Sequence, residues 1–375
     1  MEYKNKLKDL KVAIVHDWLV SLGGAERVVE SLLKLFPQAD LYTSVYDPKK
    51  VKLFKNRQVR TTFLQRWPLA KSKHQLFASI RPLAFESIDL KGYDLVISSS
   101  SAEAKGVITG TDTLHISNIY TPVRYYWSGY KEYYANPGFG FLNPIVRYFM
   151  PKMTKKLKIW DYAAAQRPDS LIAISKTVSE RINKYYNRPS TVIYPPVDVL
   201  RFENSSPKSD YYLVVSRLVP YKRVDLAVEA CTSLNRKLVV AGRGPELKNL
   251  KKLAGSSVEF LENPTDEDIT KLYSKARGFI FSAEEDFGIT PVEAMASGTP
   301  VICYGKGGAT ETVVDGKTGV FHDKQSVESL SQAINRFESI KFDKKKIKQR
   351  ANDFSEDKFL NLFGGYVVEE LQNKK

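Results

Sequence analysis

The chain has 375 residues, of which 43% are hydrophobic, and this is enough apolar material for two packed domains and excludes a disordered chain. Its apolar stretches are only strand-length and its first ten residues carry no apolar signal region, so we expect a cytoplasmic chain without a membrane span. Most of the net charge of +15 lies in residues 1–200, with 30 basic and 17 acidic side chains, and it indicates an anionic partner: nucleic acid, a membrane surface or an acidic substrate.

Short apolar or β-branched runs alternate with amphipathic segments of helix length, a pattern typical of βαβ units and parallel sheets. The strands predicted in the first half are residues 11–16, 40–45, 94–99, 113–120, 170–175 and 191–194. Those predicted in the second half are residues 211–216, 237–242, 258–262, 278–282 and 300–304. We therefore predict an α/β protein with one parallel sheet in each half.

A linker is predicted where two prolines, Pro195 and Pro196, precede the polar stretch 203–210, because prolines remove hydrogen-bond donors and break helices. The prediction is an N-terminal domain over residues 1–199 and a C-terminal domain over residues 200–354. A final helix over residues 355–375, with Ser355 as N-cap, is expected to pack back on the N-terminal domain.

The strongest local signal is the segment 284–313, which follows a predicted buried strand. It places Glu285 in the loop after that strand, at the sheet edge where open α/β sheets bind ligands. Thr290 is predicted as the N-cap of a helix with Glu293 at its third position, so a capping box is the structural alternative for Glu293. For Glu285 the alternative is a solvated turn.

A second signal is the segment 214–230, in which a strand ends at Arg217 and a helix is expected to begin near Lys222. Both cations would project at the carboxyl end of the sheet, where two charges and free helix-start amides can hold a diphosphate. An ordinary solvated basic loop is the alternative.

Glycines follow several of the predicted strands. Gly23 and Gly24 precede a helix expected over residues 25–36, so the backbone there can approach a ligand and the helix N-terminus favours an anion. Gly242 follows another strand, but the third glycine of a dinucleotide fingerprint is missing. The glycines at 305, 307 and 308 form a candidate phosphate nest.

The acidic run Asp266 to Asp268 is similar to the metal site of some sugar transferases. It follows Thr265 in the first turn of a predicted helix, however, where acids complement the helix dipole. Cys231 and Cys303 lie far apart without a CxxC spacing, which argues against a disulfide framework or a structural zinc. We therefore expect no metal and no cofactor.

Residues 120–160 hold 12 aromatic and seven basic side chains against one acidic side chain. Such a segment can stack on bases, enter a lipid interface or pack as core, and some of it must be core because 12 exposed aromatics would aggregate. The candidates for a membrane surface, with a solvated helix face as the alternative, are Lys152, Lys155, Lys156 and Lys158.

Several of these segments together resemble retaining glycosyltransferases of family 4. In chain order they are Gly23–Glu26, Tyr120–Tyr125, Tyr194–Asp198, Ser216–Lys222 and the pair Glu285 and Glu293. The resemblance covers essentially the whole chain and implies the GT-B fold, with two Rossmann-like domains facing each other across a cleft. Within the family, the segments are most similar to bacterial mannosyltransferases of surface-polysaccharide assembly that use GDP-mannose.

The resemblance also implies residue roles. Glu285 would hold the hydroxyls of the donor sugar, while Arg217 and Lys222 would stabilise the leaving diphosphate in place of a metal. Glu293 would bind the ribose hydroxyls. The other expected donor contacts are Gly23, Gly24, Gly242, Gly288, Ile289 and Thr290, and the residues expected in the acceptor or sugar pocket are Tyr120 and Arg124.

One position departs from the family. Relatives often have a histidine where this chain has Tyr120, and His115 lies five positions earlier, on the opposite face of a strand. Whether Tyr120 replaces that histidine is left open by the sequence.

We therefore expect a metal-independent, retaining hexosyltransferase that moves mannose from GDP-mannose to a lipid-linked or glycan acceptor. Attack from the same face, assisted by the leaving phosphate, is expected, without a covalent intermediate at Glu285. The basic half would dock on the inner face of the cell membrane. Two alternatives stay open: a nucleic-acid-binding protein that uses the basic half, and a catalytically degenerate protein that binds a sugar nucleotide.

Overall fold

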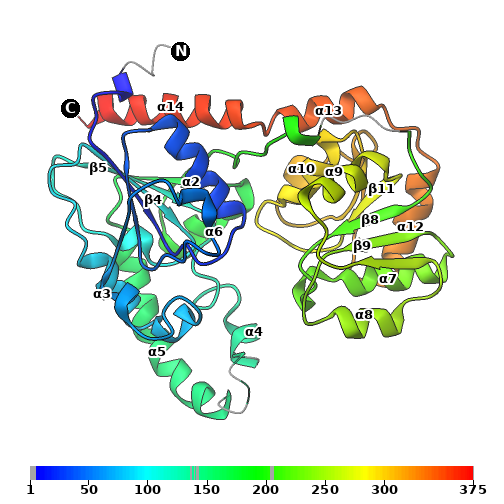
Figure 1. Ribbon diagram of the computed structural model, residues 1–375, viewed down its shortest axis with the longest axis horizontal. Coiled ribbons are helices and arrows are strands. Elements are labelled where there is room, and N and C mark those ends of the chain that lie inside the picture. Colours follow the sequence, from blue (N-terminus) through cyan, green and yellow to red (C-terminus); the bar gives the residue numbers. More distant parts are fainter. Residues whose placement is uncertain (1–5, 136, 139, 141–142, 203–206, 375) are drawn as a thin grey trace. The chain divides into compact units, whose positions relative to one another are not determined.

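The computed structural model describes residues 6–135, 137, 138, 140, 143–202 and 207–374 (Figure 1). Parts of three predicted features lie outside these residues: the chain start, the aromatic segment at 136, 139, 141 and 142, and the linker at 203–206. The chain forms two compact units, one made of residues 1–194 and 360–375 and the other of residues 195–359. The first division therefore falls at Pro195, slightly before the predicted boundary at residue 200.

The first unit is built on a seven-stranded parallel sheet in the order β3-β2-β1-β4-β5-β6-β7. Its strands are β1 (Val12–His16), β2 (Asp40–Thr43), β3 (Val59–Thr61), β4 (Leu95–Ser100), β5 (Leu114–Ile119), β6 (Ser170–Ala173) and β7 (Thr191–Val192). Every residue of β1, β4 and β5 is buried, as expected for central strands covered on both faces. All six predicted strands are confirmed, whereas β3 was missed because it is short and largely exposed.

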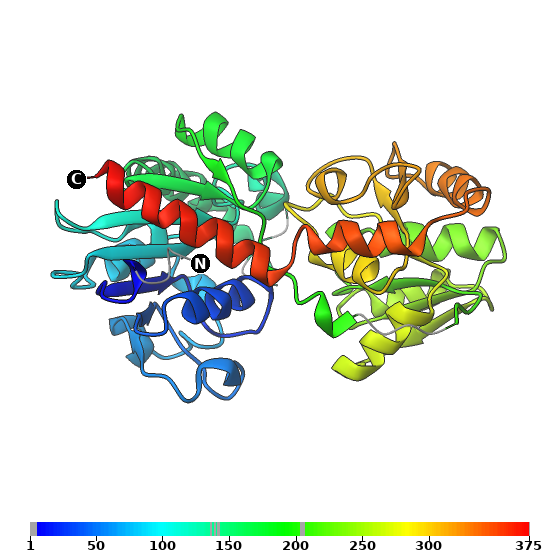
Figure 2. The ribbon, with the colours of Figure 1, turned by 90° about the horizontal axis from the view of Figure 1, so that it is seen from above.

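The helices of this unit are α2 (Gly24–Leu35), α3 (Arg81–Glu86), α4 (Tyr130–Ala135), α5 (Asn143–Ala164) and α6 (Lys176–Tyr186). The last helix, α14 (Glu356–Asn373), begins after Ser355, whose hydroxyl accepts the amide of Lys358 at 3.4 Å. Figure 2 shows α14, in red, lying along the first unit. Phe363 is fully buried there, and the Lys374 ammonium forms an ion pair with Asp169 at 2.8 Å.

The second unit is built on a six-stranded parallel sheet in the order β10-β9-β8-β11-β12-β13. Its strands are β8 (Tyr212–Val215), β9 (Leu238–Ala241), β10 (Val258–Leu261), β11 (Gly278–Phe281), β12 (Val301–Tyr304) and β13 (Gly319–His322). Its helices are α7 (Val224–Ser233), α8 (Leu247–Leu253), α9 (Asp266–Lys275), α10 (Ile289–Ala296), α11 (Ala309–Thr312), α12 (Val327–Glu338) and α13 (Lys344–Asn352). The five predicted strands are confirmed and β13 was missed. Side chains of α7 and α12 pack with those of the strands into one apolar core.

Each sheet has one place where the strand order reverses its direction: between β1 and β4 in the first unit, and between β8 and β11 in the second. Ligands of open α/β sheets bind beyond the carboxyl ends of the strands at such a switch point. These two places are therefore where candidate functional residues are sought.

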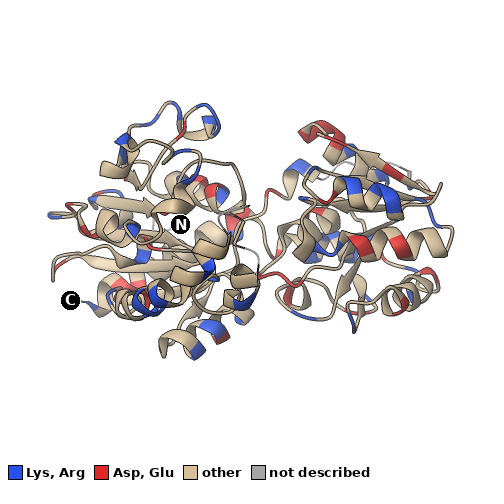
Figure 3. Cartoon of the chain, turned by 90° about the horizontal axis from the view of Figure 1, so that it is seen from below, with Lys and Arg blue, Asp and Glu red and all other residues tan. Residues whose placement is uncertain are grey.

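Charge is distributed over both units, and Figure 3 shows Lys and Arg together with Asp and Glu on each of them. Within the described part of the chain, no helix combines the length and the apolar character that crossing a membrane requires.

Candidate functional site

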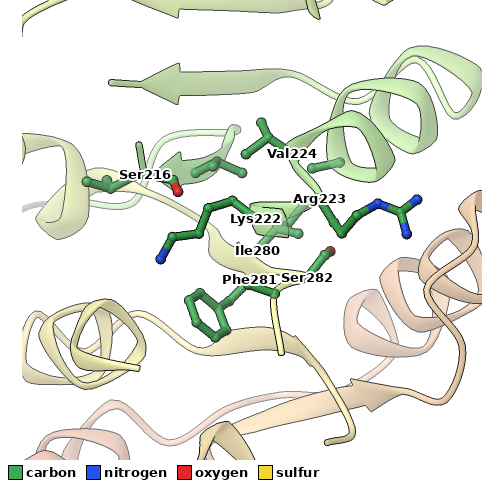
Figure 4. A pocket seen from close by; sticks show the side chains of 11 residues that line it. Ser216, Lys222, Arg223, Val224, Ile280, Phe281 and Ser282 are labelled. Carbon is green, nitrogen blue, oxygen red and sulfur yellow. The ribbon is translucent and has the colours of Figure 1, made fainter. Parts of the chain in front are cut away.

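At the switch point of the second unit, a small pocket lies beyond the carboxyl ends of β8 and β11 (Figure 4). It is lined by Val214, Val215, Ser216, Lys222, Arg223, Val224, Ala227, Ile280, Phe281, Ser282 and Ala283. In Figure 4 the side chains of Lys222 and Arg223 extend in opposite directions. Only Lys222 is directed to the site, since the guanidinium of Arg223 pairs with Asp225 of α7 at 2.9 Å.

The ammonium of Lys222 forms an ion pair with a carboxylate oxygen of Glu285, the acid in the loop after β11. Both side chains are largely shielded from water, with 15% and 21% of their surface exposed. The predicted helix start near Lys222 is confirmed, since α7 begins at Val224 with Arg223 as N-cap, after Pro220–Lys222 form a 3₁₀ turn and Arg223 adopts a left-handed conformation (φ 51°). This turn brings the ammonium back over the end of β11.

Arg217 lies in the same loop as Lys222 and is exposed. Its guanidinium donates to the hydroxyl of Tyr221 at 3.0 Å. The structure therefore brings the two predicted cations and Glu285 to one sheet edge, with Lys222 in contact with the acid and Arg217 open to solvent.

The loop that carries Glu285 is held by the glycines after β12. The amide of Gly308 donates to the carbonyl of Glu285 at 2.8 Å, and a Cβ at Gly308 would lie 2.3 Å from the Cα of Phe287. Of the glycines in the candidate phosphate nest, Gly308 therefore does not offer its amide to a phosphate, because that amide already fixes the loop.

Glu293 does not cap its own helix, so the predicted capping box at Thr290 is wrong. Helix α10 begins two residues earlier than Pro291, with Gly288 as N-cap at φ 85°, a conformation that favours glycine. Ile289 and Thr290 are consequently the first residues of the helix, and both are partly buried. The structural alternative for Glu293, a capping role in its own helix, is therefore excluded.

The carboxylate of Glu293 instead accepts the hydroxyl of Tyr273, on α9, at 3.1 Å. Burial raises the pKa of Glu293, and the hydrogen bond from Tyr273 acts in the opposite direction. A partly buried carboxylate held by one donor retains acceptor capacity for a ligand hydroxyl.

Gly242 follows β9 at φ 146°, and a Cβ there would lie 1.9 Å from the carbonyl oxygen of Ser216. The close approach of the loops after β8 and β9 is therefore a sufficient structural reason for this glycine.

The acidic run at the start of α9 has the structural role expected of it. Thr265 is the N-cap, its hydroxyl accepts the Asp268 amide at 3.1 Å, and the Asp268 carboxylate accepts the Thr265 amide at 2.9 Å. The capping interpretation is confirmed. Among the residues that the structure describes, no group of three or more His, Cys, Asp and Glu is placed to hold a metal ion.

In the first unit, Gly23 is the N-cap of α2 and Gly24 is its first residue. The amide of Gly23 donates to the carboxylate of Glu26 at 2.8 Å. Gly23 is exposed whereas Glu26 is buried, so this segment, called the glycine turn (Gly23–Glu26), presents backbone to solvent above a buried acid.

Tyr120 directly follows β5 and lies near the glycine turn, where its hydroxyl is 3.2 Å from the carbonyl oxygen of Ala25 and 2.7 Å from the hydroxyl of Ser99. Burial raises the pKa of Tyr120 above its usual value. Arg124 follows in the next turn, where it is partly buried and its carbonyl accepts the amide of Gly129 at 2.8 Å.

Sequence reasoning missed two buried polar residues at the end of β1. His16 contacts both Ser99 and Glu26, and Asp17 accepts the amides of Ser101, Ala102 and Ala104 at 2.6, 2.9 and 2.8 Å. The available signal was the change from apolar to polar residues at the end of a central strand.

The aromatic segment is partly core, as predicted. Tyr125 and Tyr126 both donate to the carboxylate of Glu103, which forms a buried ion pair with Arg81 at 2.8 Å. Trp127 donates to Asp161 at 2.6 Å. These side chains pack the segment onto the body of the first unit.

The part of the segment that lies in helix α5 has many exposed side chains. Helix α5 carries exposed apolar side chains at Ile145, Tyr148, Phe149, Met153 and Ile159. Lys152, Lys155 and Lys156 are exposed on the same helix. Lys158 is not equivalent to them, because it is partly buried and its ammonium lies 5.2 Å from the ring centroid of Trp127.

Comparison with known families agrees with this arrangement. A model of glycosyltransferase family 4 matches residues 22–201, and a model of glycosyl transferases group 1 matches residues 198–354. The chain belongs to glycosyltransferase family 4. The matched residues include the glycine turn in the first model and the Lys222, Glu285 and Glu293 segments in the second.

Curated relatives of this family 4 glycosyltransferase include mannosyltransferases. The O-antigen chain mannosyltransferase RfbU of Salmonella typhimurium is 29% identical over 194 residues, covering 46% of this chain and 55% of the relative. The GDP-mannose-dependent alpha-(1-6)-phosphatidylinositol monomannoside mannosyltransferase of Mycobacterium tuberculosis is 37% identical over 139 residues, covering 32% and 36%. The chain thus spans about half or less of the length of these relatives.

Solved structures share the fold over nearly the whole chain. HepE of Anabaena in complex with UDP is 18% identical, with a TM-score of 0.69 over 96% of this chain and 100% of that one. The sucrose-phosphate synthase of Thermosynechococcus elongatus is 16% identical, with a TM-score of 0.71 over 97% and 100%. The predicted GT-B fold is confirmed.

Proposed function

We propose that this family 4 glycosyltransferase transfers a hexose from a nucleoside diphosphate sugar to a lipid-linked or glycan acceptor, with retained configuration and without a metal. The observation that carries the proposal is the contact of Lys222 with Glu285 at the β8/β11 switch point, with Arg217 in the same loop. The two cations can stabilise the diphosphate, which gains negative charge as the bond breaks, and the carboxylate can accept hydrogen bonds from the hydroxyls of the sugar.

In the proposed reaction the bond between the anomeric carbon and the β-phosphate oxygen breaks. The acceptor hydroxyl oxygen bonds that carbon from the same face, and its proton passes to the leaving phosphate. Lys222 and Arg217 stabilise the negative charge of the leaving nucleoside diphosphate, and Glu285 accepts hydrogen bonds from the sugar. Glu293 accepts the ribose hydroxyls.

The donor is proposed to be GDP-mannose. What supports it is the similarity of the chain to the O-antigen and GDP-mannose-dependent mannosyltransferases described above, at 29% and 37% identity over parts of each chain. The structural neighbour HepE was solved with UDP, so a uridine donor is the alternative that a test must separate.

A membrane contact of helix α5 is a further part of the proposal. It is supported by exposed lysines beside exposed aromatic and aliphatic side chains on one helix, a combination that favours an anionic lipid interface. Lys152, Lys155 and Lys156 would face the lipid, and Lys158 is left out because its ammonium packs on Trp127.

Thermal unfolding with GDP, UDP and ADP at millimolar concentration, each with magnesium or with a chelator, tests the donor site. A ligand at 100 times its dissociation constant adds about 2.7 kcal/mol, which raises the midpoint by several degrees. We expect GDP to raise it equally with and without magnesium. A shift by UDP or ADP alone contradicts the donor, a need for magnesium contradicts metal independence, and no shift by any nucleotide contradicts the proposed function.

A further inference from the structure

A chain of buried polar contacts connects the glycine turn to strands β1 and β4 and to Tyr120, the residue after β5. The two carboxylate oxygens of Glu26 are divided between two partners: Oε2 accepts the Gly23 amide at 2.8 Å, and Oε1 lies 3.6 Å from Nε2 of His16. The other ring nitrogen of His16, Nδ1, contacts the hydroxyl of Ser99 at 3.0 Å and its carbonyl at 3.1 Å.

The chain closes on itself. The hydroxyl of Tyr120 lies 2.7 Å from that of Ser99 and 3.2 Å from the carbonyl oxygen of Ala25, and its single proton is shared between these two acceptors. Both ends of the chain therefore fix the same turn, one through the amide of Gly23 and the other through the carbonyl of Ala25. The contact of Nε2 with the Glu26 carboxylate requires the tautomer that carries its proton on Nε2, and in that tautomer Nδ1 accepts the hydroxyl of Ser99.

Burial distinguishes this arrangement from an ordinary helix cap. A glutamate at the third position of a helix commonly caps from the surface and needs no further partner. Here Glu26 is 6% exposed and His16 is 3% exposed, so the carboxylate has little access to water, and the imidazole supplies a partner in its place. A carboxylate deprived of that partner would lose its fixed position under the turn.

We infer that His16 is a positioning residue for the transfer reaction: acting through Glu26, it holds the shape of the glycine turn, whose two glycines are among the donor contacts that the family resemblance implies. The inference rests on the proposed function only in its last step, since the holding of the turn is a property of the first unit alone. Tyr120, in the place where relatives often have a histidine, then belongs to the same positioning chain through its hydroxyl.

Two substitutions at position 16 separate the two contacts of the ring. His16→Gln places an amide near the former Nε2, so it keeps a donor for Glu26, while His16→Asn places one near the former Nδ1 and keeps only the contact to Ser99. We expect kcat/KM for the sugar nucleotide to fall about 10-fold in His16→Asn, which loses the contact with Glu26, and to stay within about 3-fold in His16→Gln.

His115→Asn is the matched control. His115 is also a buried histidine of this sheet, but its Nε2 contacts a serine of β4, Ser98, at 2.9 Å, and its amide donates to Asp169 rather than to the glycine turn. A general loss of packing would affect both Asn variants, whereas a positioning role affects only His16→Asn. Activities are compared well below the unfolding midpoint of every variant.

Hydrogen exchange of the Gly23 amide, measured on the intact protein, provides a readout without turnover. We expect exchange about 10-fold faster in His16→Asn and unchanged in His16→Gln and His115→Asn. Equal exchange in all variants, or equal losses of kcat/KM in both Asn variants, overturns the inference. If the wild type neither binds a nucleotide nor transfers a sugar, the proposed function fails, and the exchange result still decides whether His16 holds the turn.

Discussion

The backbone amide of Gly308 donates to the carbonyl of Glu285 at 2.8 Å, so the loop after β12 fixes the acid that contacts Lys222. The contact is close enough to require glycine, because a Cβ at Gly308 would lie 2.5 Å from the carbonyl of Asp286 as well. Gly308 therefore helps to fix the position of Glu285.

Gly308→Ala should accordingly displace the loop and lower turnover by about 100-fold, the loss expected when a reacting group moves by about 1 Å. Gly365→Ala is the control, because a Cβ at that glycine of α14 would meet no atom within 4 Å. Steady-state turnover of both variants checks this expectation, and similar activities of the two would contradict the role given to Gly308.

Lys222→Met should lower kcat by orders of magnitude, because it removes a charge that stabilises the leaving diphosphate and leaves Glu285 without its ion-pair partner. Arg223→Met removes the neighbouring charge, whose guanidinium pairs with Asp225 on the side away from the site, and should retain most of the activity. Kinetics with the sugar nucleotide distinguish the two, and near-normal turnover of Lys222→Met would refute its role.

Tyr273→Phe should weaken nucleotide binding about 3- to 10-fold, because it removes the donor that holds the Glu293 carboxylate. That hydrogen bond lowers the pKa of Glu293, so its removal raises a pKa that burial has already raised. Affinity should then decline at a higher pH than in the wild type as the solution is acidified. Titrations from pH 7.5 to 5 measure this.

Tyr211→Phe is the control for that experiment, since its hydroxyl donates to the carbonyl of Leu272, one residue before Tyr273. It should leave the affinity and its pH profile unchanged. A Tyr273→Phe profile that coincides with that of Tyr211→Phe would show that Tyr273 does not act on Glu293.

Burial lowers the pKa of His115 to about 3, against about 6.5 in an unfolded chain. Between these values the unfolded chain binds a proton that the folded chain does not, so the free energy of unfolding falls as the pH drops from about 6.5 toward 3, by at most about 1.4 kcal/mol per pH unit from this group. His115→Asn should reduce that slope. Urea unfolding at pH 7, 6 and 5 tests it, and an unchanged slope would exclude His115 as a contributor.

Reversing three charges on α5, with Lys152→Glu, Lys155→Glu and Lys156→Glu together, should abolish flotation with vesicles that contain anionic lipid. The binding free energy to the membrane is expected to fall by about 1 kcal/mol for each lysine lost near the surface, and the new acids add repulsion. Reversing Lys341, Lys345 and Lys346, which are exposed in the second unit, changes the net charge equally and should leave flotation intact. Equal behaviour of the two triple variants would remove α5 from the membrane contact.

Much of the fold was predictable because its signals are local. The central strands of both sheets are continuous apolar or β-branched runs, and parallel strands buried on both faces require that pattern. The cap at Thr265 and the placement of Lys222 and Glu285 at one sheet edge also follow from short segments next to strand ends.

The sequence missed two kinds of feature: a helix start set by the backbone conformation of a nearby glycine, and contacts between residues far apart in the chain. Thr290 has the sequence of an N-cap, but the left-handed Gly288 allows α10 to begin earlier. Glu293 is bonded by Tyr273, 20 positions away, and His16 contacts Ser99 across 83 positions. Pairings of this separation depend on which strands are neighbours, and a single sequence does not specify that order.

Because of helix α14, the two units become complete at different times during synthesis. The unit of residues 195–359 is one continuous stretch, whereas the other unit needs residues 360–374 in addition to the residues before 195. Domains generally fold as they emerge from the ribosome, in order from the N-terminus. Here the unit of residues 195–359 is complete before the unit that contains the N-terminus. Until translation reaches α14, the N-terminal unit exposes the surface that Phe363 later covers.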